Sequence, residues 1–345
     1  MLNKYKKNGK ILGILFILIF IFVFGTVNAA EVTLKFGHGG NTLSELQLLA
    51  EVFERLVEDR TNGEIDVIVY PSTLTASSEE AMGFLKAGSI DMYEVYAGHI
   101  AGFCEDVQFL NLPYLFNNDA HFAAAKNSRP IQIILNEIEE ATNLEVLGVA
   151  IDMNGLAIAS IEPIRSFEEC KNVKLRCMQN PLFVDMYANF GFQPTGTDWG
   201  ELYTSLQTGL VQANDLGVKC NYEYNFNEVV NSYAITRHFW SQMIIMANRD
   251  SLAKLTPEHK EIVLTSMDEA CQVTDAYTLW VEELFIEKAI EDGATVTYPD
   301  LKPFKEASQI TNKKWFAKRP RWEGWYNEIQ SLDPEMIRPK AETTF

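Results

Sequence analysis

Arg176 is the residue whose type and position point most directly to ligand binding. In Val173-Lys174-Leu175-Arg176-Cys177 apolar residues alternate with two cations, which predicts a strand with Arg176 near its carboxyl end. Ligands of open α/β sheets bind at that edge, and a guanidinium can hold a carboxylate through two parallel hydrogen bonds. A solvated or ion-paired arginine is the alternative that the bare pattern leaves open.

A glycine-rich turn follows the first expected strand, which spans residues 32–36. Gly37-His38-Gly39-Gly40 leads into a helix with apolar residues at three- and four-residue spacing. Such a turn lets a ligand approach backbone N–H groups at a positive helix end. It resembles the start of a dinucleotide-binding fingerprint, but Thr42 stands where that fingerprint has glycine. A purely structural turn remains the alternative.

The sequence lacks the signatures of common enzyme classes. It contains no Gly-x-Ser-x-Gly, no His-Glu-x-x-His and no phosphate-binding loop motif. Its five histidines and five cysteines show no metal-ligand spacing, so we expect no metal, no cofactor and no catalytic residue. We expect Cys170 and Cys177 to be buried free thiols, and their pairing across a loop in an oxidising compartment is the alternative.

The hydrophobic pattern predicts an α/β protein with two similar halves and a long helix. The first half contains a strand–helix–strand–helix–strand order typical of a mostly parallel sheet, with elements expected at 32–36, 46–57, 65–69, 77–87 and 90–95. The second half contains elements expected at 173–177, 181–190, 199–209 and 210–211. A helix over 258–290 would be about 50 Å long, and we expect it to span both halves.

Composition restricts the class of protein further. The chain has 345 residues, of which 47% are hydrophobic, so it can bury a large core in about two domains. It carries 47 acidic and 29 basic residues, a formal charge of −18. Nucleic-acid binding requires concentrated basic residues, so we expect no nucleic-acid partner.

Residues 1–29 read as a secretory signal peptide. Four lysines precede an apolar run over 11–25, and the small residues Val27 and Ala29 suit cleavage after Ala29. We therefore expect an exported, periplasmic protein. An uncleaved membrane anchor is the alternative, although the run is shorter than the roughly 20 residues of a membrane span.

An ordered set of short segments resembles the solute-binding proteins of tripartite ATP-independent periplasmic (TRAP) transporters, of the type that binds C4-dicarboxylates. The segments are Leu34-Lys35-Phe36-Gly37-His38, Thr61-Asn62-Gly63, Val69-Tyr70-Pro71, 85–92, Leu112-Pro113-Tyr114-Leu115-Phe116, Lys174-Leu175-Arg176, 199–209 and Ile235-Thr236-Arg237-His238. They cover nearly the whole chain after the signal peptide.

The resemblance implies a type II periplasmic-binding-protein fold, with two α/β lobes around a cleft. We expect one lobe from 30–153 plus 242–281, and the other from 154–241 plus 282–345. The implied function is capture of a small organic acid, a carboxylate ligand held by Arg176, and its delivery to the membrane subunits of a TRAP permease. A sensor that serves a signalling protein and, less favoured, a secreted enzyme are the alternatives.

The family pattern also suggests which residues bind the ligand. Arg176 matches the arginine that grips a carboxylate, and Trp199 matches an aromatic position beside the ligand, with a core aromatic as its alternative. The full set of expected ligand-binding residues is Arg176, Trp199, His38, Tyr96, Asn154, Asp215, Leu216 and His238.

Two departures from the family pattern bear on the ligand. Asp215-Leu216 stands where relatives usually have Glu-Asn, so an apolar residue replaces a polar ligand contact. Gly155-Leu156-Ala157 lacks the second arginine that many relatives carry after Asn154. Both favour a monocarboxylate with an apolar, aromatic or hydroxylated remainder over a C4-dicarboxylate.

Overall fold

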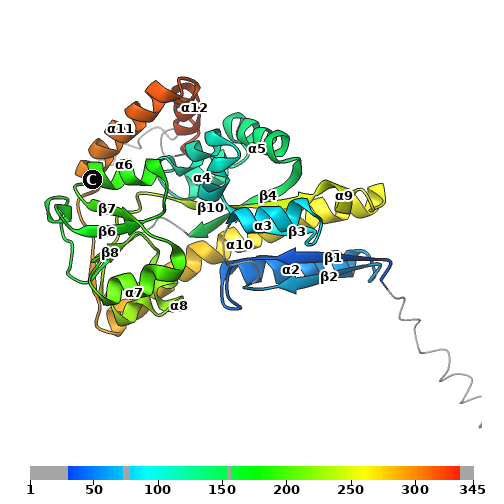
Figure 1. Cartoon of the computed structure of the whole chain (residues 1–345), viewed down its shortest axis with the longest axis horizontal. Helices are drawn as coiled ribbons and strands as arrows, with labels where there is room; N and C mark the ends of the chain where they lie inside the picture. Colours follow the sequence, from blue (N-terminus) through cyan, green and yellow to red (C-terminus); the bar gives the residue numbers. More distant parts are fainter. Residues whose placement is uncertain (1–29, 73–77, 154–156, 335–345) are drawn as a thin grey trace, which may run out of the picture.

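The computed structural model describes residues 30–72, 78–153 and 157–334. The expected signal peptide and Asn154 lie outside these residues. Within them, two β-sheets with their covering helices lie side by side and are joined by one long helix (Figure 1). We refer to the elements around these two sheets as the first and second lobes.

The first sheet combines parallel strands with one antiparallel strand between them. β1 pairs in parallel with β2 and β3, whereas β10 runs antiparallel to β3 and β4. All eight residues of β10 are buried, as expected for a strand covered on both faces. The strand order is β2 (Ile65–Tyr70), β1 (Val32–Gly37), β3 (Met92–Tyr96), β10 (Ser241–Asn248) and β4 (Leu144–Met153).

The second sheet is mixed and built from shorter strands. β6 is parallel to β7 and β8, and β5 is antiparallel to β8 and β9. The strand order is β11 (Thr295–Thr297), β9 (Ser232–Ala234), β5 (Ile158–Ser160), β8 (Ala213–Asn214), β6 (Lys174–Cys177) and β7 (Gln193–Gly196).

Helices cover both sheets. Those near the first sheet are α2 (Glu45–Arg60), α3 (Ser78–Lys86), α4 (Asp119–Ala125), α5 (Arg129–Thr142) and α9 (Arg249–Leu252). Those near the second sheet are α6 (Pro181–Asn189), α7 (Leu202–Gln207) and α8 (Val218–Glu223). The chain continues with α10 (Pro257–Glu291), α11 (Leu301–Lys318) and α12 (Arg321–Gln330).

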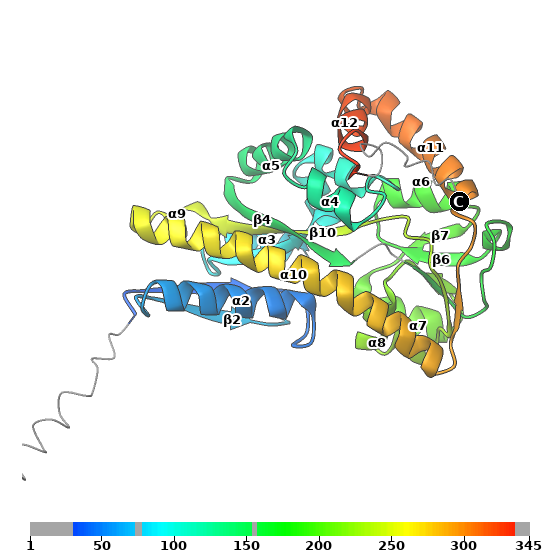
Figure 2. The same cartoon turned by 180° about the vertical axis from the view of Figure 1, so that it is seen from behind.

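The long helix α10 crosses both lobes, as the sequence predicts. Pro257 occupies its first turn, and the Thr256 side chain caps it by accepting a hydrogen bond from the His259 amide. It packs on α2 and β4 at one end and on α8 and β11 at the other, and Figure 2 shows it running across the front of both lobes. Within the described residues, no helix combines the length and apolar composition needed to cross a membrane.

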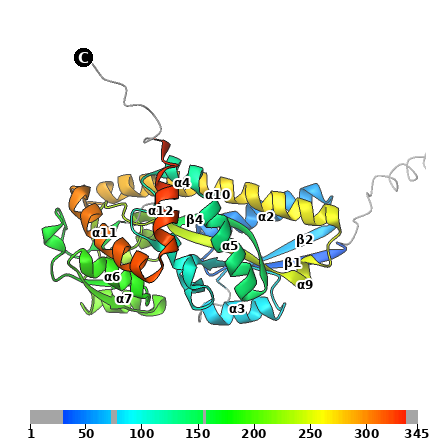
Figure 3. The same cartoon turned by 90° about the horizontal axis from the view of Figure 1, so that it is seen from above.

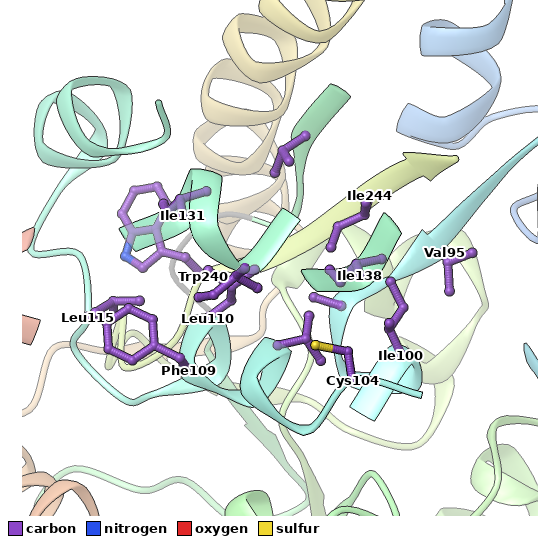
Figure 4. Close-up of a cluster of buried hydrophobic side chains, with 14 of the residues drawn as sticks. Val95, Ile100, Cys104, Phe109, Leu110, Leu115, Ile131, Ile138, Trp240 and Ile244 are labelled. Atoms are coloured by element: carbon purple, nitrogen blue, oxygen red, sulfur yellow. The ribbon is translucent and has the colours of Figure 1, made fainter. Parts of the chain in front are cut away.

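The core of the first lobe also receives residues from the end of the chain. Trp240 lies among Leu110, Leu115 and Ile131 in the close-up of this cluster (Figure 4). Trp322 of α12 belongs to the same cluster, although we expected 282–345 in the second lobe. Figure 3 shows α12 beside α5, whereas α11 lies beside α6 of the second lobe.

Three local expectations need correction. The strand expected at 210–211 forms at Ala213–Asn214 instead, and the strand expected at 90–95 is observed at Met92–Tyr96. The helix expected at 199–209 begins with a 3₁₀ turn, Trp199–Glu201, and α7 follows it. The expectation that Cys170 and Cys177 are buried free thiols is confirmed, and burial raises the pKa of each to about 12.

Candidate functional site

The Arg176 side chain lies at the carboxyl end of β6 and is 5% exposed. Its neighbours Leu175 and Cys177 alternate with it and are fully buried in the core of the second lobe. Arg176 Nε donates to the Thr197 carbonyl at 3.1 Å, and Arg176 Nη1 lies 3.8 Å from Asp215 Oδ1. Among the described residues, no acceptor forms a hydrogen bond with its terminal guanidinium nitrogens, so these donors are free for a ligand.

Asp215 connects Arg176 to a buried hydrogen-bond chain. The Tyr187 hydroxyl donates to Asp215 Oδ2 at 2.9 Å and lies 2.9 Å from His238 Nε2. On its other side, His238 Nδ1 lies 2.7 Å from the Thr236 hydroxyl. Burial raises the pKa of Asp215, and the Arg176 charge and the Tyr187 hydroxyl oppose that shift. His238 thus orients Tyr187, which in turn holds Asp215 beside Arg176.

Trp199 covers Arg176 from the solvent side. Its ring centroid is 5.9 Å from Arg176 Cζ, and its side chain is 43% exposed. It contacts Tyr224 edge-on at 4.8 Å between ring centroids. An aromatic residue this exposed is not a core residue, and its position over the guanidinium suits a cation–π contact.

The first lobe presents Tyr96 and His99 to the same place. Both residues experience the charge of Arg176, and their rings meet edge-on at 5.5 Å. Burial and then Arg176 lower the pKa of His99 to about 4, so this imidazole is neutral at pH 7. Burial, followed by the charge of Asp152, raises the pKa of Tyr96. The end of β3 therefore lies across from the end of β6.

Acidic residues of the first lobe border this region. Asp152, near the end of β4, accepts a hydrogen bond from the Ser241 hydroxyl at 2.6 Å, and burial raises its pKa. Glu94 of β3 accepts a hydrogen bond from the Gly39 amide at 3.0 Å, and burial raises its pKa to about 8. Glu94 is thus mainly protonated at neutral pH.

A buried lysine connects the two lobes. Lys219 Nζ, in α8 of the second lobe, lies 2.9 Å from Glu45 of α2 and 2.7 Å from Glu223. All three side chains are at most 10% exposed. Burial acts to lower the pKa of Lys219, but the two carboxylates outweigh it and raise that pKa. This pair of contacts ties the first turn of α2 to α8.

The expected site residues are thus not all in one place. Arg176, Asp215, His238, Trp199 and Tyr96 come together at the lobe junction, and we refer to these five as the Arg176 site.

The other expected residues lie elsewhere. His38 is buried at the end of β1, where its Nε2 bonds to Gln47 at 2.9 Å. Leu216 is buried with Leu202 and Val218 in the second lobe, and its contact with a ligand stays a prediction. Asn154 falls outside the described residues.

Sequence patterns missed several polar residues of this region. Tyr187 lies at a buried position of α6, where the pattern predicts an ordinary core residue. Asp152 lies near the end of the apolar strand β4, where the pattern predicts only the end of the strand. Lys219 lies in a short helix with four buried residues, a position where a lysine requires a partner. The position of Lys219 between the apolar residues Val218 and Cys220 is the one such signal in the sequence.

The rest of the described chain offers no competing centre. No group of three or more His, Cys, Asp or Glu residues suits a metal ion within residues 30–72, 78–153 and 157–334. A separate pocket lined by Lys126, Gly148 and Cys271 contains none of the expected site residues. Two basic residues near the end of the described chain form ion pairs within the protein, Arg319 with Glu105 and Arg321 with Glu137.

Comparison with known families identifies one matching model. Residues 36–319 match DctP, the bacterial extracellular solute-binding protein family 7. The match includes both sheets and every residue of the Arg176 site.

Individual relatives agree with this result. The chain is 25% identical over 298 residues to the 2,3-diketo-L-gulonate-binding periplasmic protein YiaO of Escherichia coli, covering 86% of this chain and 90% of the relative. It is 28% identical over 274 residues to the ectoine-binding periplasmic protein TeaA of Halomonas elongata, covering 77% and 80%.

A solved structure shows the same fold. A TRAP periplasmic solute-binding protein from Pseudomonas putida F1, crystallised with D-glucuronate, superposes with a TM-score of 0.78 at 24% identity. The alignment covers 88% of this chain and 97% of that one. The expected two-lobe α/β architecture is therefore confirmed.

Proposed function

Because this chain belongs to the DctP family of bacterial extracellular solute-binding proteins, we propose that it binds a small carboxylate through Arg176 and delivers it to the membrane subunits of a TRAP transporter. Its family members bind solutes and do not catalyse reactions. Beyond family membership, the proposal names the residue that anchors the ligand, the chemical group that this residue binds and the type of partner protein.

The observation that carries the proposal is the incomplete hydrogen bonding of Arg176. The side chain is 5% exposed, yet only its Nε donates a hydrogen bond within the described residues. Buried polar groups are nearly always hydrogen-bonded, and a carboxylate matches two guanidinium N–H groups in geometry and charge. Arg176 thus provides a preorganised carboxylate-binding group at the junction of the two lobes.

The ligands named for the relatives fit this anchor. Diketogulonate, ectoine and glucuronate, which occur in the names of the three compared proteins, each contain a carboxylate group. These ligands differ in the rest of the molecule. A shared anchor with variable surroundings explains how one family binds chemically diverse acids.

Binding at the lobe junction also implies how the ligand is released. Tyr96 and Arg176 belong to different lobes, so a ligand between them stabilises the arrangement in which the lobes meet. Hinge motion that separates the lobes would expose the ligand to a permease. Residues 1–29 would direct the chain to the periplasm, and mass spectrometry of the mature protein would show whether cleavage follows Ala29.

Calorimetry on Arg176 variants tests the carboxylate anchor. A thermal-shift screen of a small-acid library first supplies a binding compound, since a ligand at 100 times its Kd adds about 2.7 kcal/mol of stability. Removing one partner of a buried ion pair costs about 3–5 kcal/mol, so Arg176→Ala should weaken binding at least a hundredfold. Arg176→Lys should fail to rescue it, because an ammonium lacks the planar fork.

The control is Arg165→Ala, which removes an exposed arginine of the same lobe. This variant should bind like the wild type. A loss below threefold in Arg176→Ala would contradict the proposal, and near-normal affinity in Arg176→Lys would contradict the two-bond geometry.

A further inference from the structure

The surroundings of Arg176 contain no surplus of positive charge. Arg176 already faces Asp215, with 3.8 Å between Nη1 and Oδ1. The other buried cation of this region, Lys219, is shared by the carboxylates of Glu45 and Glu223. Asp152 adds a further carboxylate, whose charge reaches Tyr96 together with those of Asp215 and Arg176. Four acidic side chains therefore lie near two cations, and burial raises the pKa of Glu45 to about 7.

Two of these carboxylates have an oxygen without a hydrogen-bond donor. Within the described residues, Asp215 Oδ1 and Glu223 Oε1 are both fully buried and accept no hydrogen bond. Asp215 as a whole is 4% exposed, and the Glu223 side chain is 5% exposed. Since buried carboxylate oxygens are normally hydrogen-bonded, Asp215 Oδ1 is an acceptor available to a donor from the ligand.

The hydrogen-bond chain behind Asp215 supports its role as an acceptor. Tyr187 donates its only proton to Asp215 Oδ2 at 2.9 Å, so His238 Nε2 must donate to the Tyr187 oxygen. His238 Nδ1 lies 2.7 Å from the Thr236 hydroxyl. The charge of Arg176 and the Tyr187 hydroxyl favour the anionic form of Asp215, whereas its burial opposes that form.

Building on the proposed function, we propose that the ligand is a zwitterion whose carboxylate binds Arg176 and whose protonated nitrogen binds Asp215 Oδ1. The 3.8 Å between Arg176 Nη1 and Asp215 Oδ1 suits charged groups on neighbouring carbon atoms. An α-amino acid or a compound with the same arrangement has this geometry. Asp215 is then the residue that selects for the cationic group.

Charge balance distinguishes this ligand class from simple acids. A monoanion would place its carboxylate next to Asp215, where two like charges repel each other. It would also approach a chain with a formal charge of −18. A zwitterion adds no net charge and provides a donor for the unpartnered oxygen.

Matched ligand pairs test the proposal on the full-length mature protein. Each pair consists of an L-α-amino acid and the L-2-hydroxy acid with the same side chain, such as phenylalanine with phenyllactate or leucine with 2-hydroxyisocaproate. Thermal shift ranks the pairs, and calorimetry measures both members of the strongest pair. We expect the amino acid to bind at least tenfold more tightly than the hydroxy acid.

Asp215→Asn is the informative variant, because it removes the charge and keeps an oxygen that accepts from Tyr187. It should lose at least tenfold in affinity for the amino acid and reduce or reverse the preference within the pair. Asp250→Asn, at an exposed position in α9, is the control and should leave both affinities unchanged. Circular dichroism and the melting temperature show whether each variant is folded.

The outcomes separate the two proposals. A hydroxy acid that binds wild type as tightly as its amino acid would overturn the zwitterion, and so would an Asp215→Asn variant that keeps the wild-type preference. In either case, dependence of binding on Arg176 would leave the proposed function intact. An Arg176→Ala variant that binds the same compound as tightly as wild type would overturn the proposed function itself.

Discussion

Arg176 and Lys219 are both buried cations of the second lobe, but they differ in how many short polar contacts the protein gives them. Lys219 has carboxylate oxygens at 2.7 and 2.9 Å, one from its own helix and one from the other lobe. Arg176 has a carboxylate at 3.8 Å and one backbone carbonyl at 3.1 Å. A cation with short contacts on both sides stabilises the structure, whereas one with unused donors is prepared for a ligand.

This difference separates stability from binding. Substitution of Lys219 should mainly change the free energy of unfolding, and substitution of Arg176 should mainly change ligand affinity. Each prediction below tests this division or the contacts that support it.

The largest effect on stability is expected for Lys219→Met. The variant leaves Glu45 and Glu223 buried without their shared cation, and breaking a buried pair in this way costs about 3–5 kcal/mol. Urea denaturation measures the free energy of unfolding. Lys288→Met is the matched control, because Lys288 also pairs with an acidic residue four positions later but is half exposed. The control should cost less than about 1 kcal/mol.

Equal losses in the Lys219 and Lys288 variants would remove the distinction between the two cations. Such a result would mean that Lys219 is as well solvated as a surface lysine and does not connect the lobes.

Tyr187→Phe should have a smaller effect on stability than Lys219→Met. The substitution removes the hydroxyl shared by Asp215 and His238 and leaves a buried acceptor and a buried ring nitrogen without this partner. A buried polar group left unsatisfied costs about 1–3 kcal/mol, which urea denaturation resolves. Tyr203→Phe removes an exposed hydroxyl contact with Glu228 and should cost less than about 0.5 kcal/mol. A similar cost in both variants would show that the chain behind Asp215 is not buried.

How much the sequence revealed also differs between these two cations. Arg176 was predictable because it interrupts an apolar strand pattern near the strand's end, where the local sequence alone defines the face. The ion pair of Lys219 was not predictable, because its partner Glu45 is separated from it by more than half of the chain and only the fold brings them together.

The elements of the fold also differ in whether the local sequence determines them. The helix at Pro257–Glu291 was predicted nearly to the residue, since its periodicity is local. The position of β10 between β3 and β4 depends on pairing with strands about 90 to 150 residues away, which local patterns do not contain. The packing of Leu216 against Leu202 and Val218 likewise depends on the fold and is not contained in the local sequence.

Glu94→Gln should change how stability depends on pH. Burial raises the pKa of Glu94 in the folded protein to about 8, from an ordinary value of 4.5. The folded state then binds more protons than the unfolded state between these values, so stability falls as pH rises from about 4.5 to 8. The variant still accepts the Gly39 amide and should lose this contribution, on the order of 1 kcal/mol per unit of pKa difference.

Urea denaturation at pH 5 and pH 8 measures the free energy of unfolding of the wild type and of Glu94→Gln. Glu306→Gln, at an exposed position of α11, is the control and should keep the wild-type difference. If the free energies of unfolding at pH 5 and pH 8 differ by the same amount in Glu94→Gln and in the wild type, Glu94 is hydrated. The first lobe would then add the charge of Glu94 to the region near Arg176.

The smallest effect is expected for Trp199→Ala. The indole lies 5.9 Å from Arg176 Cζ and is 43% exposed, and a cation–π contact at such a site contributes about 0.5–1 kcal/mol. Calorimetry with the compound found for wild type should show affinity reduced about two- to fivefold. Trp280→Ala, which removes a tryptophan of α10 that is 60% exposed, should not change affinity. A loss as large as that of Arg176→Ala would mean that the aromatic ring, rather than the guanidinium, holds the ligand.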